Sequence, residues 1–148
     1  MRLISFSINQ INGIMEYVKS FRNLEVYKAS RQSSKEIFEV SKKFPREEMY
    51  SLTDQVRRSS RSIGAQIAEA WGKRKYEKHF VSKLIPICIG TDGEQLETQH
   101  WIETALDCSY ISQETAESLL KQYISVGKML NSMINKAASF CNKATIQE

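Results

Sequence analysis

The chain has 148 residues, of which 41% are hydrophobic and 26% charged, and its formal net charge is +4. The apolar share excludes an intrinsically disordered chain, and the longest apolar run, Leu84–Ile89, is far shorter than the roughly 20 residues of a membrane-spanning helix. We therefore expect a single folded domain with no membrane segment.

The first two predicted elements are helices. Apolar and small residues recur at three- and four-residue steps between Phe21 and Lys43, and Pro45 ends this helix because the residue before a proline resists the α region. The inner stripe of the first helix is expected to be Leu24, Tyr27, Ser34, Ile37, Phe38, Ser41 and Phe44. The second helix is predicted to start near Ser51, which forms a capping-box-like pair with Asp54. Its inner stripe is expected to be Leu52, Val56, Ser59, Ser60, Ile63, Ile67, Ala70 and Trp71.

The third and fourth helices follow the same periodicity. The third is predicted from Tyr76 to Cys108, with a doubtful middle because Pro86 and two glycines fall within eight residues. Ser112 is the expected N-cap of the fourth helix, whose apolar stripe extends to Phe140. Four helices with short connections predict an all-α fold, an antiparallel up-down-up-down four-helix bundle.

The expected organisation is one bundle domain with two short extensions. Residues 1–20 are predicted to be an N-terminal extension, residues 21–141 the bundle, and residues 142–148 a C-terminal tail. The first 14 residues match no element, and Met15 is a candidate start of the native chain.

Charge is strongly segregated along the sequence. Residues 19–46 carry a local charge of +5 and residues 57–83 one of +6, whereas residues 84–119 carry −7 and no lysine or arginine. The basic segments have two functional readings: they bind polyanions, or they face the acidic segment within the chain or between subunits. A third reading is a solvated surface without a specific role.

Basic residues of the second helix and the region after it are the candidate nucleic-acid contacts. Helical spacing places Arg57, Arg58 and Arg61 together on the outer face of the second helix. The full candidate set is Arg57, Arg58, Arg61, Lys73, Arg74, Lys75 and Lys78. The alternative is that these arginines pair with acids of the third helix, Glu97 and Glu103 among them. Trp71 and Tyr76 lie close enough in sequence to stack on bases, although Trp71 also fits the core stripe.

A second polar group occurs on the third helix. Glu97, His100 and Glu103 share one helix face and resemble half of a di-iron site, but the complementary Glu-x-x-His is missing. We therefore predict no metal and no cofactor, and we interpret this face as a subunit contact. The candidate interface residues are Glu97, Gln99, His100, Trp101 and Glu103.

No catalytic motif is present. The sequence has no glycine-rich phosphate loop, no nucleophile elbow and no His-Glu-x-x-His, so we predict that the protein is not an enzyme and has no catalytic residues. The three cysteines, Cys88, Cys108 and Cys141, are widely spaced and stand beside apolar residues. We expect them to be buried thiols of a cytoplasmic protein.

Three segments together resemble a known family: FRNLEVYKAS, FPREEMYSLTDQVRRSSRSIGAQIAEAWGKR and DGEQLETQHWIETALDCSYI. They are similar to the proteins encoded in 23S ribosomal RNA intervening sequences, also called four helix bundle proteins, over about Phe21 to Phe140. The chain departs from the family at Gly64, Gln66 and Ala70 and in an apparent insertion at Ile85–Ile89.

The resemblance implies a four-helix subunit that assembles into a homopentameric ring with a basic surface. The accessory variability protein of diversity-generating retroelements is similar, and it binds nucleic acid and partners a reverse transcriptase. No catalytic activity is established for the intervening-sequence family. By this resemblance the first hypothesis is a non-enzymatic homo-oligomeric scaffold that binds RNA or DNA. The alternatives are a pure protein-interaction module, for example with a reverse transcriptase as partner protein, and a di-metal enzyme.

Overall fold

The computed structural model describes residues 19–73 and 77–144, except for the side chains of residues 73, 77–85, 134 and 136–144. Within these ranges the chain is helical and has no strand. The elements are two 3-10 helices, η1 (Phe21–Asn23) and η2 (Arg46–Glu48), and four α-helices, α2 (Glu25–Ser41), α3 (Leu52–Lys73), α4 (Glu77–Asp107) and α5 (Gln113–Ala144). The expected all-helical domain is therefore confirmed.

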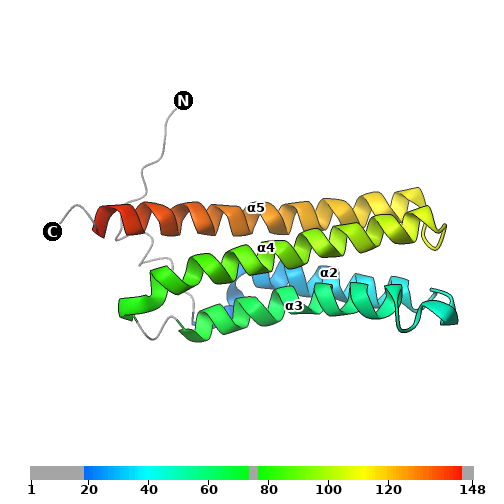
Figure 1. Cartoon of the computed structure of the whole chain (residues 1–148), viewed down its shortest axis with the longest axis horizontal. Helices are drawn as coiled ribbons and strands as arrows, with labels where there is room; N and C mark the ends of the chain where they lie inside the picture. Colours follow the sequence, from blue (N-terminus) through cyan, green and yellow to red (C-terminus); the bar gives the residue numbers. More distant parts are fainter. Residues whose placement is uncertain (1–18, 74–76, 145–148) are drawn as a thin grey trace, which may run out of the picture.

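The four α-helices lie side by side along the long axis of the molecule (Figure 1). The turn between α2 and α3 and the turn between α4 and α5 lie at one end, whereas the end of α3 and the start of α4 lie at the other. α4 packs against α3 and α5, and α2 packs against the same two helices from the other side. Among the described residues, no helix is long and apolar enough to cross a bilayer.

The core of the bundle is made by apolar side chains from all four helices. Ile63, Ile102 and Val126 are almost completely buried, and so is the ring of Tyr123. The predicted stripe of α3 and that of α5 as far as Met133 are confirmed, and the part of the α5 stripe from Ile134 to Phe140 lies outside the described side chains. Burial raises the pKa of the Tyr123 phenol, and the neighbouring Ser60 hydroxyl offsets only part of that effect.

The predicted stripe of the first helix is partly wrong. The residues of α2 that face the core are Val26, Ser30, Ser33, Ile37 and Ser41. Tyr27, Ser34 and Phe38 are only half-buried, because their positions on α2 fall at the edge of the core, toward α3. Two of the expected seven positions, Ile37 and Ser41, are fully buried, and three of the others line a surface groove.

The capping residue at the start of α5 agrees with the sequence prediction, and the one at the start of α3 does not. The Ser112 hydroxyl accepts a hydrogen bond from the backbone N–H of Thr115 at 3.1 Å, so the predicted N-cap of α5 is confirmed. At the start of α3, however, Glu48 is the capping residue: its carboxylate accepts from the backbone N–H of Leu52 at 3.2 Å and from the Ser51 hydroxyl at 2.6 Å. These bonds, with one from the Tyr110 hydroxyl, lower the pKa of Glu48. The expected pair of Ser51 with Asp54 was wrong.

The ends and the middle of the remaining helices also differ from expectation. The predicted first helix is divided, because Leu24 is extended (ψ 130°) between η1 and α2. α4 runs without interruption through Pro86, so the doubtful middle of the predicted third helix is helical. A proline removes only one backbone hydrogen bond, and the helix continues on both sides of it.

Candidate functional site

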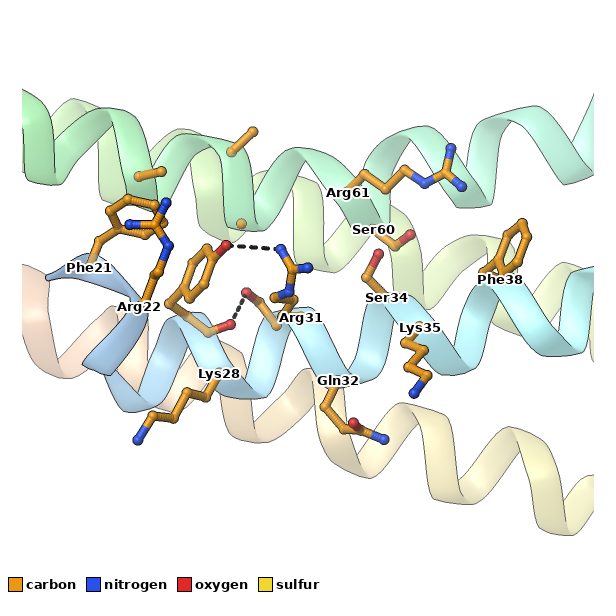
Figure 2. A pocket seen from close by; sticks show the side chains of 15 residues that line it. Phe21, Arg22, Lys28, Arg31, Gln32, Ser34, Lys35, Phe38, Ser60 and Arg61 are labelled. Atoms are coloured by element: carbon orange, nitrogen blue, oxygen red, sulfur yellow. Dashed lines mark hydrogen bonds between the residues drawn. The ribbon is translucent and has the colours of Figure 1, made fainter.

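A groove of about 1140 Å³ lies on the molecular surface between α2 and α3 (Figure 2). Its lining includes five basic side chains and no carboxylate. These side chains, called here the groove cations, are Arg22, Lys28, Arg31, Lys35 and Arg61. The groove also holds three aromatic rings, those of Phe21, Tyr27 and Phe38.

Small side chains make the groove hollow. Its floor is formed by Ser30, Ser34, Ser60, Gly64, Ala65 and Ala68. The Ser30 hydroxyl donates to the carbonyl of Tyr27 at 2.8 Å, so its polar group is satisfied within α2. A Cβ placed on Gly64 would lie 3.5 Å from the Ser30 hydroxyl oxygen, which is ordinary van der Waals contact. The glycine is therefore not required for helix contact, and its lack of a side chain adds open space.

Aromatic rings position the cations at one end of the groove. The Arg31 guanidinium donates to the Tyr27 hydroxyl at 3.2 Å, and Figure 2 shows the Arg31 side chain rising from α2 toward α3. The Tyr27 ring meets the edge of Phe21 at a centroid distance of 4.9 Å. Arg22 in turn lies 4.5 Å from the centroid of the Phe21 ring, within the range of a cation–π contact.

Phe38 gathers a second set of cations at the other end. Lys42, Arg57 and Arg61 lie 4.6, 4.9 and 5.7 Å from the centroid of its ring. Arg57 is fixed further by a hydrogen bond from its Nε to the Ser41 hydroxyl at 2.7 Å. Three positive groups around one ring create a strongly positive local field with ordered donors.

Most of this positive charge is not neutralised by acidic residues. Within the described ranges, Arg22, Arg31, Arg57 and Arg61 make no ion pair. Two lysines form ion pairs with glutamates, Lys28 with Glu25 and Lys42 with Glu39. The side chains of both pairs are at least half exposed, and exposed ion pairs contribute little to stability. The groove therefore presents guanidinium groups that have solvent, aromatic rings or hydroxyls as partners.

Arg58 has the opposite environment, although it follows Arg57 directly. It faces α4, where its guanidinium bonds Glu97 at 2.5 Å and lies 3.6 Å from Glu94. The hydrogen bond from Arg58 is the main reason that the pKa of Glu97 is lowered, and a second bond from the Trp101 indole at 3.1 Å adds to it. The expectation that the three arginines fall together was wrong, because Arg58 lies at the α3–α4 contact and Arg57 and Arg61 at Phe38 of α2.

The other four predicted nucleic-acid contacts have side chains outside the described part of the chain. Lys73 is the last residue of α3 and Lys78 lies in the first turn of α4, and their side chains are outside the described part. Arg74 and Lys75 lie wholly outside the described residues. These four positions remain predictions. Trp71, predicted as a core residue, is half-buried.

The predicted interface residues lie on α4 but differ in their exposure and in their bonding partners. Glu97 is engaged by Arg58, and the Gln99 amide donates to Gln95 at 2.6 Å. His100 is exposed and meets Trp101 edge-on at 4.7 Å, and Glu103 is exposed and makes no ion pair within the described ranges. Across that same part of the chain no group of three or more His, Cys, Asp or Glu side chains is arranged to hold a metal ion.

Apolar residues on the α4–α5 side are a feature that sequence reasoning missed. Ile89 and Leu96 on α4 are 58% and 54% exposed, and Ile124 on α5 is 47% exposed. Ile89 and Leu96 are seven residues apart and therefore share a helix face. Heptad spacing of large apolar residues outside the core stripe would have been the signal.

The cysteines differ in burial. Cys88 is 3% exposed, and burial raises the pKa of its thiol to about 11, so its role as a core residue is confirmed. Cys108 is exposed because it follows the end of α4, and the expectation of a buried thiol there was wrong. Cys141 is outside the described side chains.

Four of the five groove cations were not among the predicted site residues. Arg22, Lys28, Arg31 and Lys35 belong to the +5 segment of residues 19–46, which was noted for its charge but not used to choose candidates. Only Arg61 was named in advance. The charge of the segment was the available signal, but the sequence did not show that α2 and α3 leave an open groove between these side chains.

Comparison with known proteins identifies a sequence family and solved structures with the same fold. The sequence model of the 23S rRNA-intervening sequence protein family matches residues 22–132. A crystal structure of a protein of unknown function from the S23 ribosomal protein family of Bacteroides thetaiotaomicron is 30% identical in sequence, with a TM-score of 0.61. The match covers 74% of this chain and 97% of that one. No curated protein matches the chain.

Proposed function

The chain belongs to the 23S rRNA-intervening sequence protein family, and we propose that it is a non-enzymatic, homo-oligomeric scaffold that binds RNA or DNA through the groove between α2 and α3. The subunit in this proposal is an antiparallel up-down-up-down bundle, in keeping with the alternating positions of the turns in Figure 1. A pentameric ring and a cytoplasmic location are the parts that rest on the resemblance alone.

The observation that carries nucleic-acid binding is the set of unpaired arginines in a groove without carboxylates. Phosphate binding requires positive charge, ordered donors and release of counterions, and it requires no base-specific group. Arg31 and Arg61 supply charge from opposite sides of the groove, since one lies on α2 and the other on α3. The guanidinium of arginine can also donate two parallel hydrogen bonds to two oxygens of one phosphate.

The observation that supports assembly is the exposed apolar face of α4. Leu96 shares its helix face with Ile89, seven residues before it, and with the exposed Glu103, seven residues after it. Carboxylates repel nucleic acid, so this face suits a protein partner, and we propose a second copy of the chain. The basic segments elsewhere in that second copy supply the complementary charge.

Leu96 gives a direct test of assembly. L96E places a charge at the centre of the apolar face and should reduce the mass measured by light scattering to that of one subunit, because desolvating a new carboxylate is costly. M49E is the matched control, since Met49 is similarly exposed but lies in the turn between α2 and α3. An unchanged mass for L96E, or a wild-type protein that is already monomeric, would contradict assembly through α4.

The nucleic-acid proposal is tested by two double variants with equal charge change. R31Q/R61Q removes two groove cations, and K121Q/K128Q removes two exposed lysines of α5. In fluorescence anisotropy at low salt, we expect R31Q/R61Q to weaken binding of a mixed-sequence RNA at least about tenfold and to flatten its salt dependence. We expect the α5 variant to change affinity by less than about threefold. Equal losses in both variants, or no binding by the wild type, would refute the groove as the site.

The alternative function is an assembly module without nucleic-acid binding, in which the groove receives a protein. The specific observation for it is that the same chain carries both an exposed apolar face on α4, which includes Glu103, and a basic groove between α2 and α3. That partner would be a second copy or another protein, such as the reverse transcriptase implied by the resemblance. Under this alternative R31Q/R61Q lowers the mass of the oligomer, and wild-type protein ignores RNA.

A further inference from the structure

The groove between α2 and α3 contains aromatic rings that the core does not use. Phe21 and Phe38 are half-buried and neither packs against the hydrophobic core cluster. Both stand beside groove cations, Phe21 beside Arg22 and Phe38 beside Arg61. Partly exposed rings interleaved with arginines are the combination with which proteins bind the bases and phosphates of single strands.

The width of the groove restricts what can enter it. A narrow strip between two helices favours a ligand whose bases are accessible: in a single strand the base faces are open to rings such as Phe21 and Phe38. In a duplex the bases are paired and stacked inside the helix, so the rings would meet only its outer surface and the phosphates would carry the binding. The small floor residues, Ser34, Ser60 and Gly64 among them, give a strand room to approach the backbone of both helices.

The length and the layout of the groove give the size of the site. The part of α2 from Lys28 to Phe38 rises about 15 Å, which alone corresponds to roughly four nucleotides at the about 3.4 Å spacing of a stacked strand, and Phe21 extends the lining before the start of α2. In Figure 2, Phe38 rises from α2 toward α3, whereas Lys28 and Lys35 point away from α3. The rings are therefore inside the groove, with the two lysines at its outer rim.

We propose that the α2–α3 groove binds single-stranded nucleic acid in preference to duplex, with bases stacked on the rings of Phe21 and Phe38. Phosphates lie against the groove cations. This inference rests on the proposed function, because it names the form of nucleic acid that the same groove takes.

The first test compares strands. A fluorescein-labelled 12-nucleotide DNA of mixed sequence and its annealed duplex are titrated with wild-type protein, and we expect the single strand to bind at least about tenfold tighter. Equal or tighter binding of the duplex would overturn the preference for single strands, while leaving nucleic-acid binding itself intact. Failure of both ligands to bind would instead refute the proposed function.

The second test addresses the rings. F21L/F38L keeps apolar bulk and all charges, and we expect its affinity for the single strand to fall about tenfold while its affinity for the duplex changes little. F44L is the control, since Phe44 packs against Tyr110 outside the groove. Thermal unfolding by circular dichroism monitors folding of both variants. If F21L/F38L lost no more affinity than F44L, base stacking in the groove would be excluded.

A spectroscopic measurement avoids dependence on a folded variant. A single 2-aminopurine in the labelled strand should lose fluorescence when wild-type protein binds, because stacking quenches this base. Binding measured by anisotropy without any quenching at any position of the base would show that the strand is held by its phosphates alone, and would overturn the stacking part of the proposal.

Discussion

Neighbouring arginines on the two sides of α3 have different kinds of partner. Toward α4, Arg58 is held by Glu97 and Glu94, beside a buried hydrogen bond of 2.8 Å from the Thr98 hydroxyl to Ser59. Toward α2, Arg57 and Arg61 meet the ring of Phe38 and no carboxylate. The difference comes from the partner helix: α4 supplies acids, and the facing side of α2 supplies serines, aromatics and further bases. A cation of α3 is structural on one side and available for a ligand on the other.

The largest expected effect on stability comes from the buried contact between α3 and α4. T98V removes the hydroxyl that donates to Ser59 and leaves a buried oxygen short of its partner. We expect the free energy of unfolding to fall by about 1–3 kcal/mol in urea denaturation. S34A, which removes a hydroxyl in the α2–α3 groove, should change it by less than about 0.5 kcal/mol. Similar losses in the two variants would contradict the contrast between the two sides.

Two arginines one helical turn apart provide a sharper comparison. R58Q should lower the free energy of unfolding by about 1 kcal/mol, because the pair is partly exposed and solvent screens it, and should leave nucleic-acid affinity unchanged. R61Q should leave stability unchanged and weaken binding of a single strand about three- to tenfold. Urea denaturation and anisotropy on both variants check this. The contrast would be lost if R58Q weakened binding as much as R61Q.

The floor of the groove predicts a stabilising change. Because a Cβ at Gly64 meets only ordinary contacts, G64A should raise the free energy of unfolding by up to about 1 kcal/mol through helix propensity. Gly127 on α5 is the matched opposite, since a Cβ there would lie 2.7 Å from the Gln95 amide nitrogen. Because the Gln95 side chain is buried and must shift, G127A should lower the free energy of unfolding, and urea denaturation of both variants measures the two changes. Stabilisation by both changes would show that α4 and α5 are less closely packed than described.

The smallest effect is a pH dependence at the α3–α4 contact. The pKa of Glu97 is lowered in the folded protein, mainly by the hydrogen bond from Arg58. The stability from this pair is therefore complete above the ordinary carboxylate range and is lost as the pH falls through the lowered pKa. The difference in Tm between wild type and R58Q should be present at pH 7 and shrink by about pH 3. A difference that is constant over this range would rule out ionised Glu97 as the partner of Arg58.

Periodicity in the sequence was sufficient for the features that depend on one helix. The apolar stripes around Ile63 and Val126 and the Ser112 N-cap were predicted because each depends on residues within a turn or two. Features that depend on how the helices are oriented relative to one another were not predicted. Helical spacing turns Arg57 and Arg58 about 100° apart around α3, but only the positions of α2 and α4 decide that one meets Phe38 and the other Glu97.

The groove shows the same limit. Tyr27 and Phe38 were assigned to the core because they are large and apolar at helical spacing. The core positions of α2 are Val26, Ser30 and Ser33 with Ile37 and Ser41, so Tyr27 packs only against the edge of the core and Phe38 lies at the surface beside the arginines. Likewise Glu48, four residues before Leu52, takes the capping role from Ser51 because its side chain folds back onto the turn.

The most direct test of the α2–α3 groove as a binding site is to find where a bound strand touches the protein. A 12-nucleotide RNA containing 4-thiouridine is cross-linked to wild-type protein by ultraviolet light, and the modified peptides are identified by mass spectrometry. We expect the cross-links to fall on peptides that contain Phe21, Tyr27 or Phe38, and to disappear in R31Q/R61Q. Cross-links confined to α4 and α5, with α2 unmodified, would contradict the account.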